Sequence, residues 1–205
     1  GSDKVRLITD LRSVNQCQHV PRHKAENWAT VLKTIQDHKN NWALTLDLKD
    51  WFHHLQLHPK QKRWMRIMHQ GQAYQLEGMP FGWSHSPWWS QKLAKPIRGW
   101  LHQQGVPHCW YVDDVMVLGN TKQETENRAW LLVQQLTQLG IRVNKEKTMK
   151  EASQIVQYLG HMINFKENKI HPLQDKVLHA KSLTKKQQAG RVYTRKHLAA
   201  LAGTL

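Results

Sequence analysis

Two adjacent carboxylates, Asp113 and Asp114, follow Tyr111 and Val112 between two apolar runs that predict a hairpin. Aspartates at the tip of such a hairpin contribute nothing to packing, and buried together they repel each other and lose hydration. A cation that neutralises both would stabilise the pair. An Asp-Asp pair is weak evidence by itself, because acidic residues also occur in ordinary turns.

A third carboxylate strengthens the metal-binding interpretation. In residues 44–48 the leucines share one face of a predicted strand, whereas Thr45 and Asp47 share the other. Asp47 is thus a lone carboxylate on an otherwise apolar strand. If it converges with Asp113 and Asp114, the three could hold two divalent ions about 4 Å apart, the arrangement used for in-line phosphoryl displacement.

The composition points to a polyanionic partner. The 205 residues include 30 Lys and Arg against 15 Asp and Glu, a net charge of +15. An excess of this size favours nucleic acid as the ligand. Much of this positive charge lies in residues 142–197, which have 13 basic and 4 acidic side chains and a net charge of +9. Nucleic-acid contact is the favoured interpretation of this segment, and a solvated surface is the alternative.

Cysteine usage and the chain ends suggest a piece of an intracellular protein. Cys17 and Cys109 are too few for a disulfide framework or a zinc cage, which predicts reduced thiols and a cytoplasmic or nuclear location. The 14 histidines raise the alternative of zinc near residues 53–58, where no cysteine lies. No membrane span or signal peptide is recognisable. Residues 1–2 look like a tag remnant, and the chain is expected to be a fragment.

Helices and strands are expected to intermingle around these carboxylates. Strands are predicted at 5–9, 44–48, 65–68, 72–76, 141–143 and 155–163, with a hairpin at 106–118. The strand over 44–48 is expected to continue through residues 51–57. Helices are predicted at 24–36, 86–104 and 121–139, from 171 and from 194. Thr121 and Glu124 form a capping box at the start of the third. This mixture favours an α+β fold with an antiparallel sheet packed on helices.

With these residues placed, the chain resembles a reverse transcriptase of the retroelement kind over nearly all of residues 4–205. The motifs follow the family's order: Arg6 with DLRSVN (10–15), LDLKDWF (46–52), MPFGWSHSP (79–87), YVDD (111–114), residues 140–147 and YLGH (158–161). Lys95-Pro96 and the tail 193–205 are most similar to DIRS-type, tyrosine-recombinase retrotransposons. Phe81, where retroviral members usually have glutamine, and Trp83 imply a place outside the retroviral branch, with an LTR-retrotransposon or retroviral type as the alternative.

The resemblance implies a right-hand polymerase fold, with an antiparallel palm sheet packed on helices, partial fingers and the start of a thumb. Partial fingers are expected over residues 1–40 and fingers again over 59–80. The palm is expected over 41–58 and over 81–163, which includes the primer grip. Residues 164–205 would form a connection and a truncated thumb.

The same resemblance implies RNA-templated DNA synthesis for retrotransposon replication, with an RNA template, a DNA or RNA primer and dNTPs. Asp47 and Asp113 are expected to bridge two Mg²⁺ ions, which Mn²⁺ could replace, and Asp114 is expected to be a weaker ligand. A catalytically weak fragment or a polymerase-derived nucleic-acid-binding module is the alternative. An RNA-dependent RNA polymerase fits less well, because such enzymes usually have Gly where this chain has Val112 and a small or polar residue in place of Phe52.

Further roles come from the same motifs. The nucleotide-binding set is Arg6, Asp50, Trp51, Phe52, Phe81 and Lys147. Phe52 is expected to act as a steric gate against a 2′-hydroxyl, with a core phenylalanine as the alternative, and Arg6 as a triphosphate clamp. Lys147 could protonate the leaving pyrophosphate or be simply solvated. The template and primer set is Gly82, Trp83, Tyr111, Val112, Leu159, Gly160 and His161, with the Trp83 indole available for stacking on a base.

Overall fold

The computed structural model describes residues 9–22, 26–38 and 41–185. Its central sheet is antiparallel, with strands in the order β1-β5-β4. The strands are β1 (Trp42–Asp47), β4 (His108–Tyr111) and β5 (Asp114–Gly119). Leu44, Leu46 and Leu48 are buried, as the alternation predicted. Each fully buried leucine contributes roughly 1.5–3 kcal/mol, so this pattern fixes the face that β1 turns to the core.

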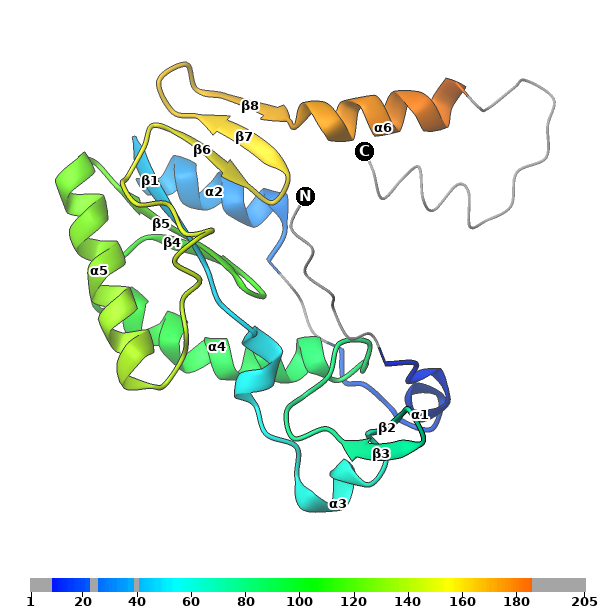
Figure 1. Ribbon diagram of the computed structural model, residues 1–205. Coiled ribbons are helices and arrows are strands. Elements are labelled where there is room, and N and C mark those ends of the chain that lie inside the picture. Colours follow the sequence, from blue (N-terminus) through cyan, green and yellow to red (C-terminus); the bar gives the residue numbers. More distant parts are fainter. Residues whose placement is uncertain (1–8, 23–25, 39–40, 186–205) are drawn as a thin grey trace.

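Two helices cover the leucine-bearing face of this sheet (Figure 1). They are α4 (Ser86–Gln103) and α5 (Lys122–Gln138). The start of α5 follows the predicted capping pattern, because Thr121 Oγ1 accepts a hydrogen bond from the Glu124 backbone N–H at 3.2 Å. The main core cluster therefore lies between the sheet and these two helices.

The opposite face of the sheet packs against helix α2 (Trp28–His38) and a second antiparallel sheet, in the order β6-β7-β8. Its strands are β6 (Ile155–Tyr158), β7 (His161–Asn164) and β8 (Lys169–Pro172), and α6 (Gln174–Lys185) follows. The prediction of one strand over 155–163 was wrong. The chain reverses at Leu159 and Gly160, whose φ values of 45° and 75° suit the twist of a tight hairpin.

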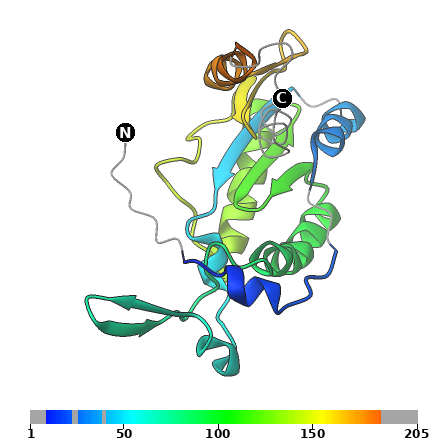
Figure 2. The same cartoon turned by 90° about the vertical axis from the view of Figure 1, so that its right-hand side faces the viewer.

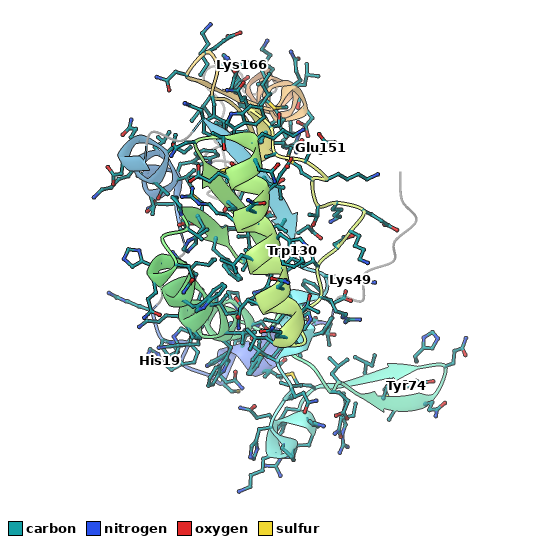
Figure 3. All side chains as sticks on the ribbon, turned by 90° about the vertical axis from the view of Figure 1, so that its left-hand side faces the viewer. His19, Lys49, Tyr74, Trp130, Glu151 and Lys166 are labelled. Atoms are coloured by element: carbon teal, nitrogen blue, oxygen red, sulfur yellow. The ribbon has the colours of Figure 1, made fainter. Side chains whose placement is uncertain are left out.

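A third group of elements projects away from the central sheet (Figure 2). Its elements are α1 (Arg12–Gln16), α3 (Pro59–Lys62), β2 (Arg66–His69) and β3 (Gln72–Gln75). A separate small core of Leu11, Leu57, Met65, Met79 and Trp83 supports it. The β2–β3 hairpin pairs as predicted, and Tyr74 on it is 44% exposed (Figure 3).

The α+β prediction with an antiparallel sheet packed on helices is confirmed. Two local predictions were wrong. Residues 51–54, expected to continue the β1 strand, form the short 3₁₀ helix η1 (Trp51–His54), and Val143 makes only an isolated bridge to Leu48. The strand predicted from residue 5 falls almost entirely, and the helix from 194 wholly, outside the described residues. Within the described part of the chain, no helix is long and apolar enough to cross a membrane.

Candidate active site

Three carboxylates meet at one end of the central sheet. The register of β1 on β5 pairs Asp47, the last residue of one strand, with Asp114, the first residue of the other. Asp113 lies in the adjoining turn, where its backbone carbonyl accepts a hydrogen bond from the Leu48 N–H at 2.8 Å. Residues far apart in the sequence are thus held together by backbone pairing, which is the convergence expected from the sequence.

The turn before Asp113 adopts an unusual backbone conformation. Val112 has a φ of 54°, a left-handed conformation that a β-branched side chain rarely adopts. The Trp110 indole Nε1 donates a hydrogen bond to the Val112 carbonyl at 3.0 Å. That indole is buried and lies 5.8 Å from the Trp51 ring. The surrounding core therefore holds the turn in a conformation that its own sequence does not favour.

A loop that follows α5 wraps around Asp47. The Asn144 N–H donates to the Asp47 carbonyl at 2.8 Å, and the Asp47 N–H donates to the Thr148 hydroxyl at 3.2 Å. Lys147 Nζ lies 3.3 Å from Asp47 Oδ2. The supporting roles of Asn144 and Thr148 were missed at the level of sequence. No local pattern could reveal them, because Thr148 and Asp47 are 101 positions apart.

The site carries surplus negative charge. Burial, followed by the charges of Asp113 and Asp47, raises the pKa of Asp114 to about 6, and Lys147 acts in the opposite direction. Among the described residues, no group of three or more His, Cys, Asp or Glu side chains is arranged so that it could hold a metal ion. The oxygen-only donor set nevertheless fits Mg²⁺, which keeps several water ligands and needs few carboxylates. A divalent ion here would offset both the burial and the neighbouring negative charges that raise this pKa.

A depression of about 470 Å³ joins the carboxylates to the β6–β7 turn. Asp47, Asp114 and Lys147 line it together with Leu159 and Gly160 of the turn. The structure therefore brings two of the residues predicted to grip a primer beside the carboxylates.

His161, the third residue of that predicted grip, lies differently. It begins β7, and its ring packs against Trp28 of α2 with the ring centroids 4.3 Å apart. His161 does not line the depression. Its position suggests that it supports the turn from the side of α2.

Four of the predicted nucleotide-binding residues lie in, next to or against η1: Asp50, Trp51, Phe52 and Phe81. Phe52 is half-buried, and its ring meets Phe81 edge-on at 5.4 Å. Asp50 has a φ of 53° and pairs with Arg142 at 3.2 Å. Trp51 is buried, with its indole N–H unpaired. Because its side chain belongs to the core, Trp51 offers a ligand only its backbone.

The loop before α4 shows one error in the sequence interpretation. Gly82 has a φ of 87°, and its carbonyl accepts a hydrogen bond from the Asn15 amide at 2.9 Å. Trp83 is only 3% exposed, and its indole N–H donates to Gln18 at 2.8 Å. The expected stacking of Trp83 on a base was wrong for this structure, because the ring fills the small core. Arg6 lies outside the described residues.

Comparisons with known proteins give consistent results. The family model described as "Reverse transcriptase (RNA-dependent DNA polymerase)" matches residues 2–163. The Gag-Pol polyprotein of Koala retrovirus is 30% identical over 173 residues, covering 80% of this chain and 10% of that protein. The Pol polyprotein from the Drosophila melanogaster transposon gypsy is 26% identical over 177 residues, covering 84% of this chain and 16% of that protein. The chain thus spans only a small part of these relatives.

Solved structures give the same picture of the fold. A foamy viral protease-reverse transcriptase in complex with dsDNA superimposes with a TM-score of 0.72 at 19% identity, covering 97% of this chain and 39% of that one. The same kind of protein in complex with an RNA/DNA hybrid gives a TM-score of 0.67 at 18% identity, covering 95% and 25%. At this identity the likeness concerns the fold alone, and it confirms the predicted polymerase fold.

Proposed function

The chain belongs to the reverse transcriptase (RNA-dependent DNA polymerase) family, and from that premise we propose that it catalyses RNA-templated DNA synthesis by nucleotidyl transfer to a primer 3′-hydroxyl. One observation carries the proposal above all. The register of β1 on β5 gathers Asp47, Asp113 and Asp114 beside a depression that the β6–β7 turn borders.

In this proposal Asp47 and Asp113 hold two Mg²⁺ ions, which Mn²⁺ could replace, and Asp114 is the weaker ligand. When bound, such ions activate the attacking hydroxyl and neutralise the charge of the leaving pyrophosphate. The chain contributes carboxylates fixed at strand ends, so little rearrangement is needed when a nucleotide arrives. Lys147, which neutralises Asp47 in the structure, is proposed to turn to the pyrophosphate and protonate it.

The incoming nucleotide is proposed to lie over η1. Phe52 would exclude a 2′-hydroxyl, and the edge-on contact with Phe81 would keep its ring in place. Asp50 and Trp51 would offer backbone N–H groups to the triphosphate, with Arg6 as its clamp. The contact of two rings supports this assignment, because an exclusion role requires a ring that cannot move aside.

The primer end is proposed to lie between the hairpin of Tyr111 and Val112 and the turn of Leu159 and Gly160, with His161 supporting that turn. Gly82 would allow the template backbone to approach closely. The foamy viral protease-reverse transcriptases named above are in complex with dsDNA and with an RNA/DNA hybrid. An RNA template, a DNA or RNA primer and dNTPs are accordingly the proposed partners of this chain.

In domain terms, residues 41–58 and 81–163 would form the palm and residues 1–40 and 59–80 the fingers. Residues 164–205 would form the connection and the beginning of a thumb. A cytoplasmic or nuclear location also belongs to the proposal, since Cys17 and Cys109 are free thiols. Retrotransposon replication is the proposed context. The relatives named above are retroviral and gypsy polyproteins, so the assignment to DIRS-type elements stays a prediction.

Extension of a primed RNA template in Mg²⁺, with deoxyribonucleotides or ribonucleotides in parallel, tests the proposal. We expect extension with deoxyribonucleotides alone, its loss in EDTA, and its return with Mg²⁺ or Mn²⁺. Extension with ribonucleotides would identify an RNA polymerase instead. Tight binding of the primed template without extension by either nucleotide would identify a non-catalytic binding module.

A further inference from the structure

We propose that Glu26 is a positioning residue for the hairpin of residues 111–114, through the hydrogen bond that its carboxylate accepts from the backbone of strand β4. This inference rests on the proposed function, because that hairpin carries two of the proposed metal ligands. Glu26 belongs to none of the motifs that identified the family, and it lies just before α2.

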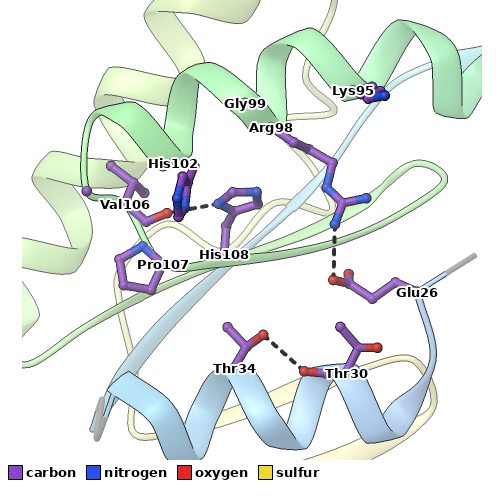
Figure 4. Close-up of a pocket in the computed structure, with 11 residues that line it drawn as sticks. Glu26, Thr30, Thr34, Lys95, Arg98, Gly99, His102, Val106, Pro107 and His108 are labelled. Atoms are coloured by element: carbon purple, nitrogen blue, oxygen red, sulfur yellow. Dashed lines mark hydrogen bonds and ion pairs between the residues drawn. The ribbon is translucent and has the colours of Figure 1, made fainter.

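The Glu26 carboxylate is almost fully enclosed. Its side chain is 2% exposed, and Oε1 lies 3.5 Å from the Arg98 guanidinium of α4 (Figure 4). The other oxygen, Oε2, accepts a hydrogen bond from the Trp110 backbone N–H. Strand β4 is at the edge of the central sheet, where outward N–H groups lack a strand partner. Glu26 therefore takes the place of a neighbouring strand at Trp110.

Trp110 connects this bond to the hairpin. Its main chain is held by Glu26, and its indole Nε1 holds the carbonyl of Val112 at 3.0 Å. Glu26, Trp110, Tyr111 and Val112 also line the same small gap of about 10 Å³. Two hydrogen bonds thus link Glu26 to the left-handed residue directly before Asp113. Such a residue keeps its strained conformation only while its surroundings hold it there.

A purely packing role explains a carboxylate at this position poorly. Burial raises the pKa of Glu26, while Arg98 and the Trp110 N–H act in the opposite direction. A buried ion pair often contributes no more stability than apolar side chains of similar volume. What a carboxylate does supply is a directional acceptor for an otherwise unpaired N–H group. A buried carboxylate at residue 26 therefore fits a role in holding strand β4 in place better than a role in filling the core.

The bond can be removed without opening a large cavity. Glu26→Gln keeps an oxygen that can accept from Trp110, whereas Glu26→Leu keeps the approximate volume and removes the acceptor. Hydrogen–deuterium exchange of residues 109–116 reports on the hairpin, and single-nucleotide addition gives kcat and KM for the dNTP. For Glu26→Leu we expect exchange about tenfold faster and kcat about tenfold lower, with KM changed less than about twofold. Glu26→Gln should stay within about threefold of wild type in both measurements.

Glu124→Leu is a matched control, because Glu124 also accepts a hydrogen bond from a backbone N–H, that of Asn120, at 2.7 Å. It should lower the melting temperature without changing kcat or exchange in the hairpin. The inference is overturned if Glu26→Leu exchanges no faster in residues 109–116 than wild type, or only as much faster as the rest of the chain does. Failure of the wild type to add nucleotides would instead overturn the proposed function, and the exchange measurement would still decide the role of Glu26.

Discussion

At the scale of single residues, Phe52 carries the proposed choice between deoxyribonucleotides and ribonucleotides. Its ring is half-buried against Phe81, and Phe52 lies in η1, the short helix that follows the strand ending at Asp47. If the ring excludes a 2′-hydroxyl, Phe52→Val should raise ribonucleotide incorporation by about tenfold or more, with only a modest loss for deoxyribonucleotides. A clash discriminates more strongly than a lost contact does, so the change in preference should be large. Single-nucleotide extension with each sugar measures it.

Phe165→Val is the matched control, since Phe165 is also a partly buried phenylalanine but packs in the core on the other face of the sheet. It should lower the melting temperature and leave sugar preference unchanged. If Phe52→Val behaves like the control, Phe52 is a core residue and the RNA-polymerase alternative regains support.

Asp114 gives a prediction about stability and pH. Its pKa of about 6 in the folded chain lies above the ordinary value of 3.8. Between these two pH values the folded chain binds more protons than the unfolded chain, so stability falls as the pH rises from about 4 to about 6. In EDTA, Asp114→Asn should therefore melt at a higher temperature than wild type above pH 6 and at a similar temperature near pH 4. A difference in melting temperature between the two proteins that stays constant across this range would show that burial and the neighbouring charges do not destabilise the Asp114 carboxylate.

At the scale of elements, the β6–β7 turn depends on Gly160. Its φ of 75° disfavours any side chain, and an added Cβ would meet the side chain of Lys176. Gly160→Ala should cost about 1–2 kcal/mol, which lowers the melting temperature by roughly 2–4 °C for each kcal/mol. Primer–template affinity should fall with it if this turn grips the primer.

Gly99→Ala is the control for that substitution. Gly99 lies inside α4 with no atom near an added Cβ, so alanine there should stabilise the helix by about 0.5–1 kcal/mol. Opposite shifts in the melting temperatures of the two variants are expected. A Gly160→Ala variant as stable as wild type would contradict the turn described here.

Elements that depend on patterns among neighbouring residues were predictable from the sequence. Features that depend on contacts between residues far apart in the sequence were not. Thr121 and the apolar period predicted the start of α5, and alternation predicted the buried face of β1. The reversal at Leu159 was missed because leucine rarely adopts a positive φ, although Gly160 inside a strand pattern was a usable signal. Trp83 was assigned to base stacking because no residue near it in the sequence indicates its hydrogen bond to Gln18. Nor does any indicate its packing in the small core with Leu57 and Met65.

At the scale of the whole molecule, the net charge of +15 should govern affinity for nucleic acid. Helix α6 continues from β8 at one end of the protein (Figure 1), and Lys176 and Lys181 on it are exposed. If these lysines contact phosphates, log affinity for a primer–template should fall linearly with log salt, with a slope of roughly −0.7 to −0.9 per contact. Neutralising Lys176, Lys181 and Lys185 together should flatten that slope by about 2–3.

Lys122→Gln on α5 provides the comparison, because Lys122 is already paired with Glu151 at 2.5 Å. It should leave the slope nearly unchanged. An unaltered slope in the triple variant would favour the alternative that α6 is a solvated surface that does not contact nucleic acid. Four of the other basic residues of this segment, Lys186, Arg191, Arg195 and Lys196, lie outside the described residues.

The central claim is that the end of the β1–β5 pair is a metal-dependent site of nucleotidyl transfer. The most direct measurement is the rate at which wild type and Asp113→Asn add one deoxyribonucleotide to a primed RNA template in Mg²⁺. The substitution preserves size and removes one ligand charge, so we predict a loss on the order of 10²-fold or more, with an unchanged melting temperature. A near-normal rate for Asp113→Asn, alongside an active wild type, would contradict the account.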